Sequence, residues 1–112
     1  MILEQPKILY VEDSPHLAKS LRVYFSGIAT DFDVSVLDRR RALGCLQANG
    51  FEMVFVGRMA DDIYAKSIES YAARNEIPLV HLGLNYDRGG ENDLSGRIRV
   101  CWEEQKARKR YS

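Results

Sequence analysis

The chain has 112 residues, with 16 basic and 16 acidic side chains and a formal net charge of zero. This length fits a single domain around one core, and a neutral chain has no overall field that attracts nucleic acid or an anionic membrane. A hydrophobic fraction of 46% and a charged fraction of 29% are those of an ordinary globular domain. We therefore treat residues 1–112 as one domain.

The compartment is predicted from the cysteines and the start of the chain. Cys45 and Cys101 show no metal-ligand spacing, and Cys45 falls in an apolar helical pattern that favours a free, buried thiol. Residues 1–6 lack the basic and apolar regions of a signal peptide, and no apolar run approaches the roughly 18 residues of a membrane span. We expect a cytoplasmic protein with no membrane partner.

The first apolar run stops abruptly at two acids. Residues 7–11 are short and β-prone, and Ser14 and Pro15 suit the start of a helix. Glu12 and Asp13 therefore follow a strand, at the edge where open parallel sheets bind ligands. Paired carboxylates suit Mg²⁺. An equally weighted interpretation is that Asp13 caps the helix and Glu12 is solvated.

Helix and strand patterns then alternate along the chain. A helical pattern over residues 15–25 is followed by a strand pattern over residues 32–36 and a second helical pattern over residues 39–48. The strand alternates apolar and polar residues, which favours an edge position. The Arg39-Arg40-Arg41 run in the first turn of the second helix is interpreted as a solvated face rather than a nucleic-acid site.

The most apolar segment, residues 51–56, predicts a central strand buried on both faces. The strand ends at Gly57, and Asp61 or Asp62 can cap a helix that reaches about residue 73. Residues 77–82 predict a fourth strand, which begins next to a proline.

The pattern weakens after the fourth strand. Residues 85–96 are polar, contain three glycines and predict a long loop. Residues 97–102 alternate apolar and polar side chains, which predicts a final strand. Residues 103–112 are charged and predict a short last helix or the start of a linker.

This alternation predicts a three-layer, doubly wound α/β domain with a parallel sheet. Among such folds, the lengths favour the flavodoxin-like strand order 2-1-3-4-5. The predicted core residues are those that the successive strands and helices must bury: Ile8, Tyr10, Leu21, Val34, Leu43, Val54, Val56, Val80 and Leu82.

The segment Lys7-Ile8-Leu9-Tyr10-Val11-Glu12-Asp13-Ser14-Pro15, followed by Leu17 and Leu21, resembles the opening of a response regulator receiver domain of the CheY-like type. The resemblance extends through Ala42-Leu43, Leu46 and residues 51–56 and 77–80, and it covers about the first 83 residues. It implies Mg²⁺ on the acidic pair and a phosphoryl group accepted by an aspartate that ends the third strand. It also implies a hydroxyl group and a lysine that stabilise this phosphoryl group.

Three positions depart from the receiver pattern. The phosphoacceptor position falls on Gly57 and the hydroxyl position on Gly83, while the predicted fifth strand, residues 97–102, contains no lysine. The connection before that strand is too short and glycine-rich for a regular fourth helix. The resemblance therefore predicts an atypical receiver with no catalytic residues, no phosphoacceptor and a shortened or missing fourth helix.

The predicted acidic pocket keeps only Glu12 and Asp13. Two carboxylates imply at most weak Mg²⁺ binding, and no other cofactor is expected. Arg58, beside the vacated acceptor position, could reach both carboxylates and supply positive charge in place of the metal. An equally weighted interpretation makes Arg58 a solvated loop residue.

The predicted function is a non-enzymatic, phosphorylation-independent protein-interaction module of two-component-type signalling. Its partner would be another signalling protein or a second copy. A missing helix would leave apolar residues uncovered, and such patches mark interfaces. The interface candidates are Leu84, Ile98, Val100 and Trp102, although Trp102 also suits a core position.

Two alternatives remain. Asp61 or Asp62 could accept a phosphoryl group as a displaced carboxylate, which requires a reshaped loop. The basic tail, with Lys106, Arg108, Lys109 and Arg110, could bind nucleic acid. It lacks a recognition-helix pattern and a stacking platform, so nucleic acid is the less favoured partner.

Overall fold

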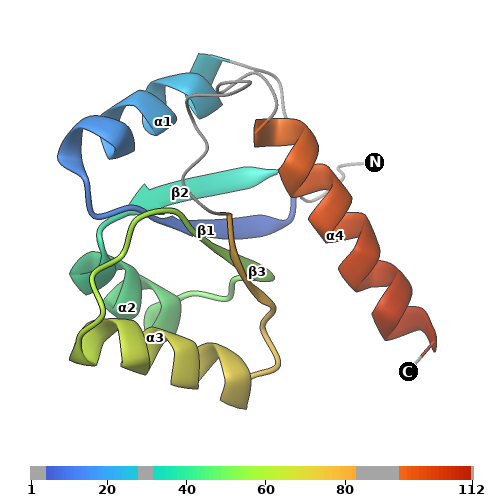
Figure 1. Ribbon diagram of the computed structural model, residues 1–112. Helices are drawn as coiled ribbons and strands as arrows, with labels where there is room; N and C mark the ends of the chain where they lie inside the picture. The colour runs from blue at the N-terminus through green and yellow to red at the C-terminus, as the bar shows by residue number, and fades with distance from the viewer. Residues whose placement is uncertain (1–4, 28–31, 83–93, 112) are drawn as a thin grey trace.

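The computed structural model describes residues 5–27, 32–82 and 94–111 (Figure 1). Strands and helices alternate along these residues, as the sequence predicts. They are β1 (Lys7–Val11), α1 (Pro15–Gly27), β2 (Asp33–Leu37), α2 (Arg39–Ala48), β3 (Met53–Val56), α3 (Ile63–Arg74), β4 (Leu79–His81) and α4 (Leu94–Tyr111).

The four strands form one parallel sheet in the order β2-β1-β3-β4. The register places Ile8 beside Val34 on one side and beside Met53 on the other, and Val54 pairs with Leu79. This arrangement confirms the α/β fold class and the first four positions of the predicted strand order. β1 and β3 lie in the centre and β2 at an edge, also as predicted.

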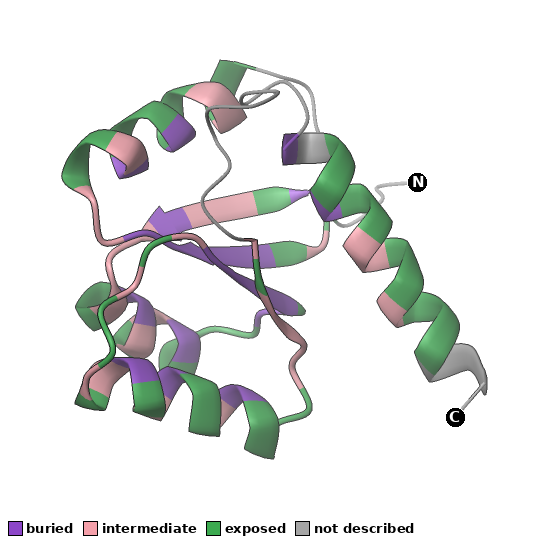
Figure 2. Ribbon diagram, viewed as in Figure 1, coloured by how far each residue is buried: buried purple, intermediate pink, exposed green. Residues whose placement is uncertain are grey.

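Helices cover both faces of the sheet, which gives three layers (Figure 1). Because successive residues of a strand point to opposite faces, Ile8 and Tyr10 pack against α1 and α4, whereas Leu9 and Val11 pack against α2 and α3. Figure 2 shows the buried residues concentrated on the central strands and on the inward sides of the helices.

Most of the predicted core is confirmed. Ile8, Tyr10, Leu21, Val54 and Val56 are at most 2% exposed. The remaining four predicted core residues are partly buried and pack against the two core clusters: Val34, Leu43, Val80 and Leu82.

The predicted strand over residues 97–102 is wrong, because these residues lie inside α4. Ile98 and Val100 would share one face of a strand, but they are 0% and 57% exposed, as expected for opposite sides of a helix. Leu94, Ile98, Cys101 and Trp102 form the stripe that packs against the core. The spacing of Leu94, Ile98 and Cys101 is that of a helix, but the sequence pattern places Leu94 in a polar loop, so the stripe is incomplete without the structure.

The predicted last helix is therefore longer than expected and begins at Leu94. Its first residues, Leu94 to Gly96, belonged to the predicted 84–96 connection. The rest of that connection, with Leu84 and the predicted shortening of the fourth helix, lies outside the described residues. Within the described ranges there is no fifth strand.

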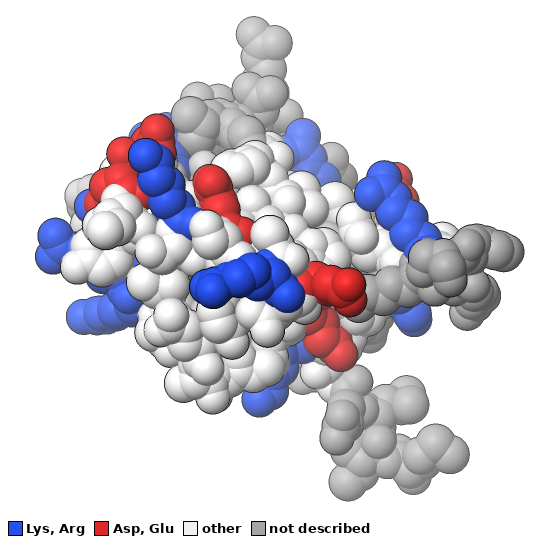
Figure 3. Space-filling view, turned by 90° about the horizontal axis from the view of Figure 1, so that it is seen from below, with Lys and Arg blue, Asp and Glu red and all other residues white. Residues whose placement is uncertain are grey.

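The surface mixes charges of both signs. On the face of α2 and α3, seen from below in Figure 3, acidic and basic side chains are interspersed among uncharged ones. No helix in the described part of the chain has both the length and the apolar character needed to cross a membrane.

Candidate functional site

Three loops meet at the carboxyl edge of the sheet. The backbone N–H of Glu12 donates to Leu37 O at 2.9 Å, that of Asp13 to Arg58 O at 2.7 Å, and that of Gly57 to Val11 O at 3.0 Å. These bonds tie the loop after β1 to those after β2 and β3. The acidic pair therefore lies beside Gly57, where the parallel sheet was expected to place it.

Asp13 is fully engaged by protein groups. Its Oδ1 accepts a hydrogen bond from the backbone N–H of Arg39 at 3.0 Å. Its Oδ2 accepts one from the backbone N–H of Ala60 at 2.7 Å and lies 3.1 Å from Nη1 of Arg39. Both oxygens of the second acid in the pair are thus occupied by groups from the next two loops.

Arg39 links Asp13 to a second carboxylate. Its Nε donates to Oδ2 of Asp62 at 2.7 Å, while Nη1 contacts Asp13. The other oxygen of Asp62, Oδ1, accepts from the backbone N–H groups of Tyr64 and Ala65 at 3.0 and 3.2 Å and caps α3. Arg39 therefore joins the ends of β1, α2 and α3 in one ion-pair network.

The network shifts the pKa values of both partners. The hydrogen bond from Arg39 is the main cause that lowers the pKa of Asp62 below its ordinary value. The hydrogen bond to Asp62 is likewise the main cause that raises the pKa of the Arg39 guanidinium. Both groups therefore stay charged at neutral pH.

Glu12 has a different environment. It is 1% exposed, and burial is the main cause that raises its pKa above the ordinary value. Its Oε2 accepts from the backbone N–H of Ser14 at 3.1 Å and its Oε1 from that of Arg58 at 3.3 Å. Glu12 thus acts as a buried acceptor that joins two loops.

The arginine in the acidic pocket is Arg39, not Arg58. The side chain of Arg58 is exposed; its backbone N–H donates to Glu12, and its positive charge acts to lower the pKa of Glu12. Arg39 was interpreted as part of a solvated run, which fits Arg40 and Arg41 but not Arg39. The missed signal is the capping residue Asp38, because its cap fixes residue 39 in the first turn of α2, at the carboxyl edge of the sheet.

The residues present do not fit a magnesium site. Every oxygen of Glu12 and Asp13 accepts an N–H donor, and the Arg39 guanidinium lies against Asp13. Magnesium instead requires ionised, available oxygen ligands in octahedral geometry. No cluster of three or more potential metal ligands occurs among the described residues.

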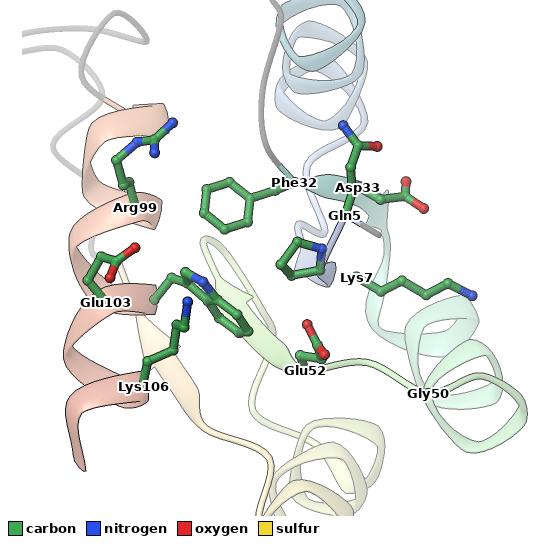
Figure 4. A pocket seen from close by; sticks show the side chains of 11 residues that line it. Gln5, Lys7, Phe32, Asp33, Gly50, Glu52, Arg99, Glu103 and Lys106 are labelled. Carbon is green, nitrogen blue, oxygen red and sulfur yellow. The ribbon is translucent and has the colours of Figure 1, made fainter. Parts of the chain in front are cut away.

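A cleft of about 1170 Å³ lies at the opposite, amino edge of the sheet (Figure 4). α4 forms one wall, and the starts of β1, β2 and β3 form the other. The cleft is lined by Gln5, Pro6, Lys7, Phe32, Asp33, Gly50, Glu52, Arg99, Trp102, Glu103 and Lys106.

The structure separates the interface candidates. Ile98 is buried in the core and was wrongly expected to be uncovered, while Val100 is 57% exposed on the outer side of α4. Trp102 is half-buried and lies edge-to-face on Phe32, with 6.1 Å between ring centroids. Leu84 and Gly83 lie outside the described residues. Among the candidates in the described residues, Trp102 is partly exposed and also lines the cleft.

Comparison with known proteins places the chain by its fold. No protein-family model matches it, and no curated protein matches it by sequence. Among solved structures, it is similar to the receiver domain of the Francisella response regulator 1452, with a TM-score of 0.53 and 20% sequence identity over 83% of this chain and 76% of the other. The chain therefore has the fold of a response regulator receiver domain.

Proposed function

We propose that the chain is an atypical, receiver-like regulatory module that binds another protein and is not switched by aspartyl phosphorylation. It has no enzymatic activity of its own. The observation that carries this proposal is the bridge from Arg39 to Asp13 and Asp62 at the edge where a receiver would hold its metal.

The bridge supports a constitutive state. A guanidinium 3.1 Å from Asp13 supplies positive charge without a metal ion and without a phosphate. The position directly after β3 is Gly57, which has no carboxylate to accept a phosphoryl group. Both features support a module that signals through binding rather than through phosphorylation.

A displaced phosphoacceptor is less well supported. Arg39 lowers the pKa of Asp62, and the other oxygen of Asp62 caps α3. Both carboxylate oxygens of Asp62 therefore already accept hydrogen bonds. Asp61 is exposed and has no such constraint. If any carboxylate accepts a phosphoryl group, the geometry favours Asp61 over Asp62.

Nucleic acid is also less well supported than a protein partner. Lys106 and Arg108 are exposed on α4, but Lys106 Nζ lies 5.7 Å from the centroid of the Trp102 ring. A chain of zero net charge provides no general attraction to phosphates. DNA binding that weakens steeply with salt would revive this alternative.

Incubation with acetyl phosphate and Mg²⁺, followed by intact mass measurement, tests the proposal. We expect no phosphoryl adduct on the wild type. An adduct lost in the Asp61→Asn variant but kept in Asp62→Asn would replace the proposal with the displaced-acceptor mechanism. An authentic receiver domain assayed in parallel shows that the phosphodonor is active.

The partner is another signalling protein or a second copy of the chain. Sedimentation velocity across a concentration series separates these cases, because a second copy produces concentration-dependent association. The Trp102→Ala variant should weaken such association if the cleft takes part in it. A wild-type protein that stays monomeric across the series would indicate that the partner is a different protein.

A further inference from the structure

One side of the sheet ends in a strand with outward-facing backbone groups. β4 pairs with β3, and no strand lies on its other side among residues 5–27, 32–82 and 94–111. Pro78 O accepts a hydrogen bond from β3 at 2.9 Å, and the N–H of Leu82 donates to β3 at 3.0 Å. Because alternate residues of a parallel strand bond to the same neighbour, Leu79 and His81 direct their N–H and C=O groups away from β3. Among the described residues, no hydrogen bond to these outward groups is formed.

The apolar side chains of β4 are covered less completely than those of β3. Val54 and Phe55 of β3 are 0% exposed, whereas their partners Leu79 and Val80 are only partly buried. Val80 lies on the sheet face covered by α1 and α4, and Leu79 lies on the face covered by α2 and α3. A further strand beside β4 would therefore bury apolar surface on both faces of the sheet.

The opposite side of the sheet, formed by β2, is protected by a side chain. The N–H of Glu12 donates to Leu37 O, so the preceding residue, Val36, directs its C=O group outward. Arg22 Nε donates to this Val36 O at 3.1 Å. A strand added to β2 would have to displace the arginine, and charged side chains on an edge strand oppose such pairing. β4 has no comparable side-chain bond in the described part of the chain, so it is the side open to a further strand.

A second copy of β4 fits this open side in one antiparallel register. A two-fold axis at Val80 pairs each Leu79 with His81 of the other copy, and each such pair exchanges both backbone hydrogen bonds. An axis at Leu79 would need the N–H of Ile77, which already donates to Ala72 O at 2.8 Å. An axis at His81 would pair only one residue of β4, because the strand ends there. The register centred on Val80 is therefore the one that uses every outward-facing group of β4.

We propose that two copies of the chain associate through β4 and join their sheets into one continuous sheet. Val80 of one copy then lies beside Val80 of the other in a non-hydrogen-bonded pair, where side chains approach most closely. The assembly stops at two copies, because Arg22 protects β2 at both ends of the joined sheet. With only three residues in β4, the dimer is weak and forms at high protein concentration. This inference rests on the proposed function, since it names a second copy as the partner of the same module.

A proline at position 81 tests the backbone bonds. His81→Pro removes an outward N–H but no bond to β3, so the fold is kept while the dimer loses one donor from each copy. In sedimentation velocity, we expect concentration-dependent dimers of the wild type and at least about tenfold weaker association of His81→Pro. The matched control His81→Thr keeps the N–H and suits a strand, so it should associate like the wild type. A urea midpoint close to that of the wild type shows that the proline variant is folded.

Single cysteines test the register without relying on the proline variant. In the proposed dimer, two copies of Val80→Cys face each other with about 4.5 Å between Cα atoms, within reach of a disulfide. Two copies of Leu79→Cys are diagonal neighbours about 7–8 Å apart, too far to bond. Mild oxidation should therefore link Val80→Cys to itself, and Leu79→Cys to His81→Cys in a mixture, but not Leu79→Cys to itself. Wild-type protein oxidised in parallel measures the background from Cys45 and Cys101.

Three results would overturn the inference. They are a wild-type protein that stays monomeric up to about 1 mM, association of His81→Pro as tight as that of the wild type, and equal cross-linking of Leu79→Cys and Val80→Cys. A monomeric wild type would still leave a different protein as the partner of the proposed module. A phosphoryl adduct in the acetyl phosphate assay would contradict the proposed function while leaving the pairing of β4 intact, so the two failures are distinguishable.

Discussion

Charged side chains make different kinds of contact at the two edges of the sheet. At the carboxyl edge, Arg39 contacts Asp13 and Asp62 within 3.1 Å, so one guanidinium bridges two carboxylates from different loops. At the amino edge, Arg99 lies over the ring of Phe32 and Lys106 over that of Trp102, beside a cleft that Glu52 also lines. The charged groups at the carboxyl edge are therefore joined by ion pairs, whereas the cations at the amino edge contact aromatic rings beside a cleft.

Two arginines of α2 also differ in how closely they contact acidic side chains. Arg39 and Arg41 both lie in its first turn, but the Arg41 side chain is 74% exposed and its Nε lies 3.7 Å from Asp38. The Arg39 side chain is 22% exposed and contacts two carboxylates. Position in the tertiary structure, rather than residue type, decides which arginine belongs to the site.

The largest expected effect concerns α4, which forms one wall of the cleft at the amino edge of the sheet. Ile98→Ala should lower the free energy of unfolding by about 2–5 kcal/mol, because Ile98 is 0% exposed and its loss leaves a cavity. Urea unfolding measures the change. Val100→Ala, at a residue 57% exposed on the same helix, should change stability by less than about 0.5 kcal/mol. Equal losses at both positions would contradict the docking of α4.

The second effect concerns the carboxyl edge of the sheet, where Arg39 contacts Asp13. Gly57→Asp restores a third carboxylate, and Arg39→Ala removes the guanidinium from Asp13. The double variant should bind Mg²⁺ at least about tenfold more tightly than either single variant, because affinity follows the number of available charged ligands. Isothermal titration with MgCl₂ measures this. A single Gly57→Asp variant that binds as tightly as the double one would show that Arg39 does not exclude the metal.

The third effect is a pair of pH dependences with opposite signs. The folded-state pKa of Glu12 is raised above 4.5, so its contribution to stability is fully present below that value and is lost as the pH rises through the folded pKa. The folded-state pKa of Asp62 is lowered below 3.8, so its contribution is present above that value and is lost as the pH falls through the folded pKa.

Urea midpoints of Glu12→Gln and Asp62→Asn, measured from acid to neutral pH, test this pair. Relative to the wild type, Glu12→Gln should gain stability as the pH rises above 4.5. Asp62→Asn should lose stability as the pH rises towards 3.8 and keep a constant deficit above it. Curves that run parallel to the wild type in both variants would contradict the assigned environments.

The smallest expected effect is that of Arg41→Ala. Its ion pair with Asp38 is long and exposed, and such pairs contribute little. The urea midpoint should be unchanged, whereas Arg39→Ala should lower it. A shift for Arg41→Ala as large as that for Arg39→Ala would remove the distinction between the two arginines.

Local sequence patterns were sufficient for most of the fold. The bounds of β1 and α2 follow from a short apolar run and from the helical pattern over residues 39–48, because both signals act within a few residues. The helical stripe of α4 was harder to recognise. Its first apolar residue, Leu94, follows a polar, glycine-containing stretch, and an alternating pattern of three apolar residues fits a strand as well as one side of a helix.

The sequence by itself determined the parallel α/β sheet, the acidic pair at the end of β1 and the absence of a carboxylate at Gly57. The tertiary structure decided that Arg39 contacts Asp13, and that Trp102 lies on Phe32. The first group depends on periodicity and residue type, which neighbouring positions fix. The second group joins residues 26 and 70 positions apart (39 minus 13, and 102 minus 32), and only the packing of strands and helices brings such residues together.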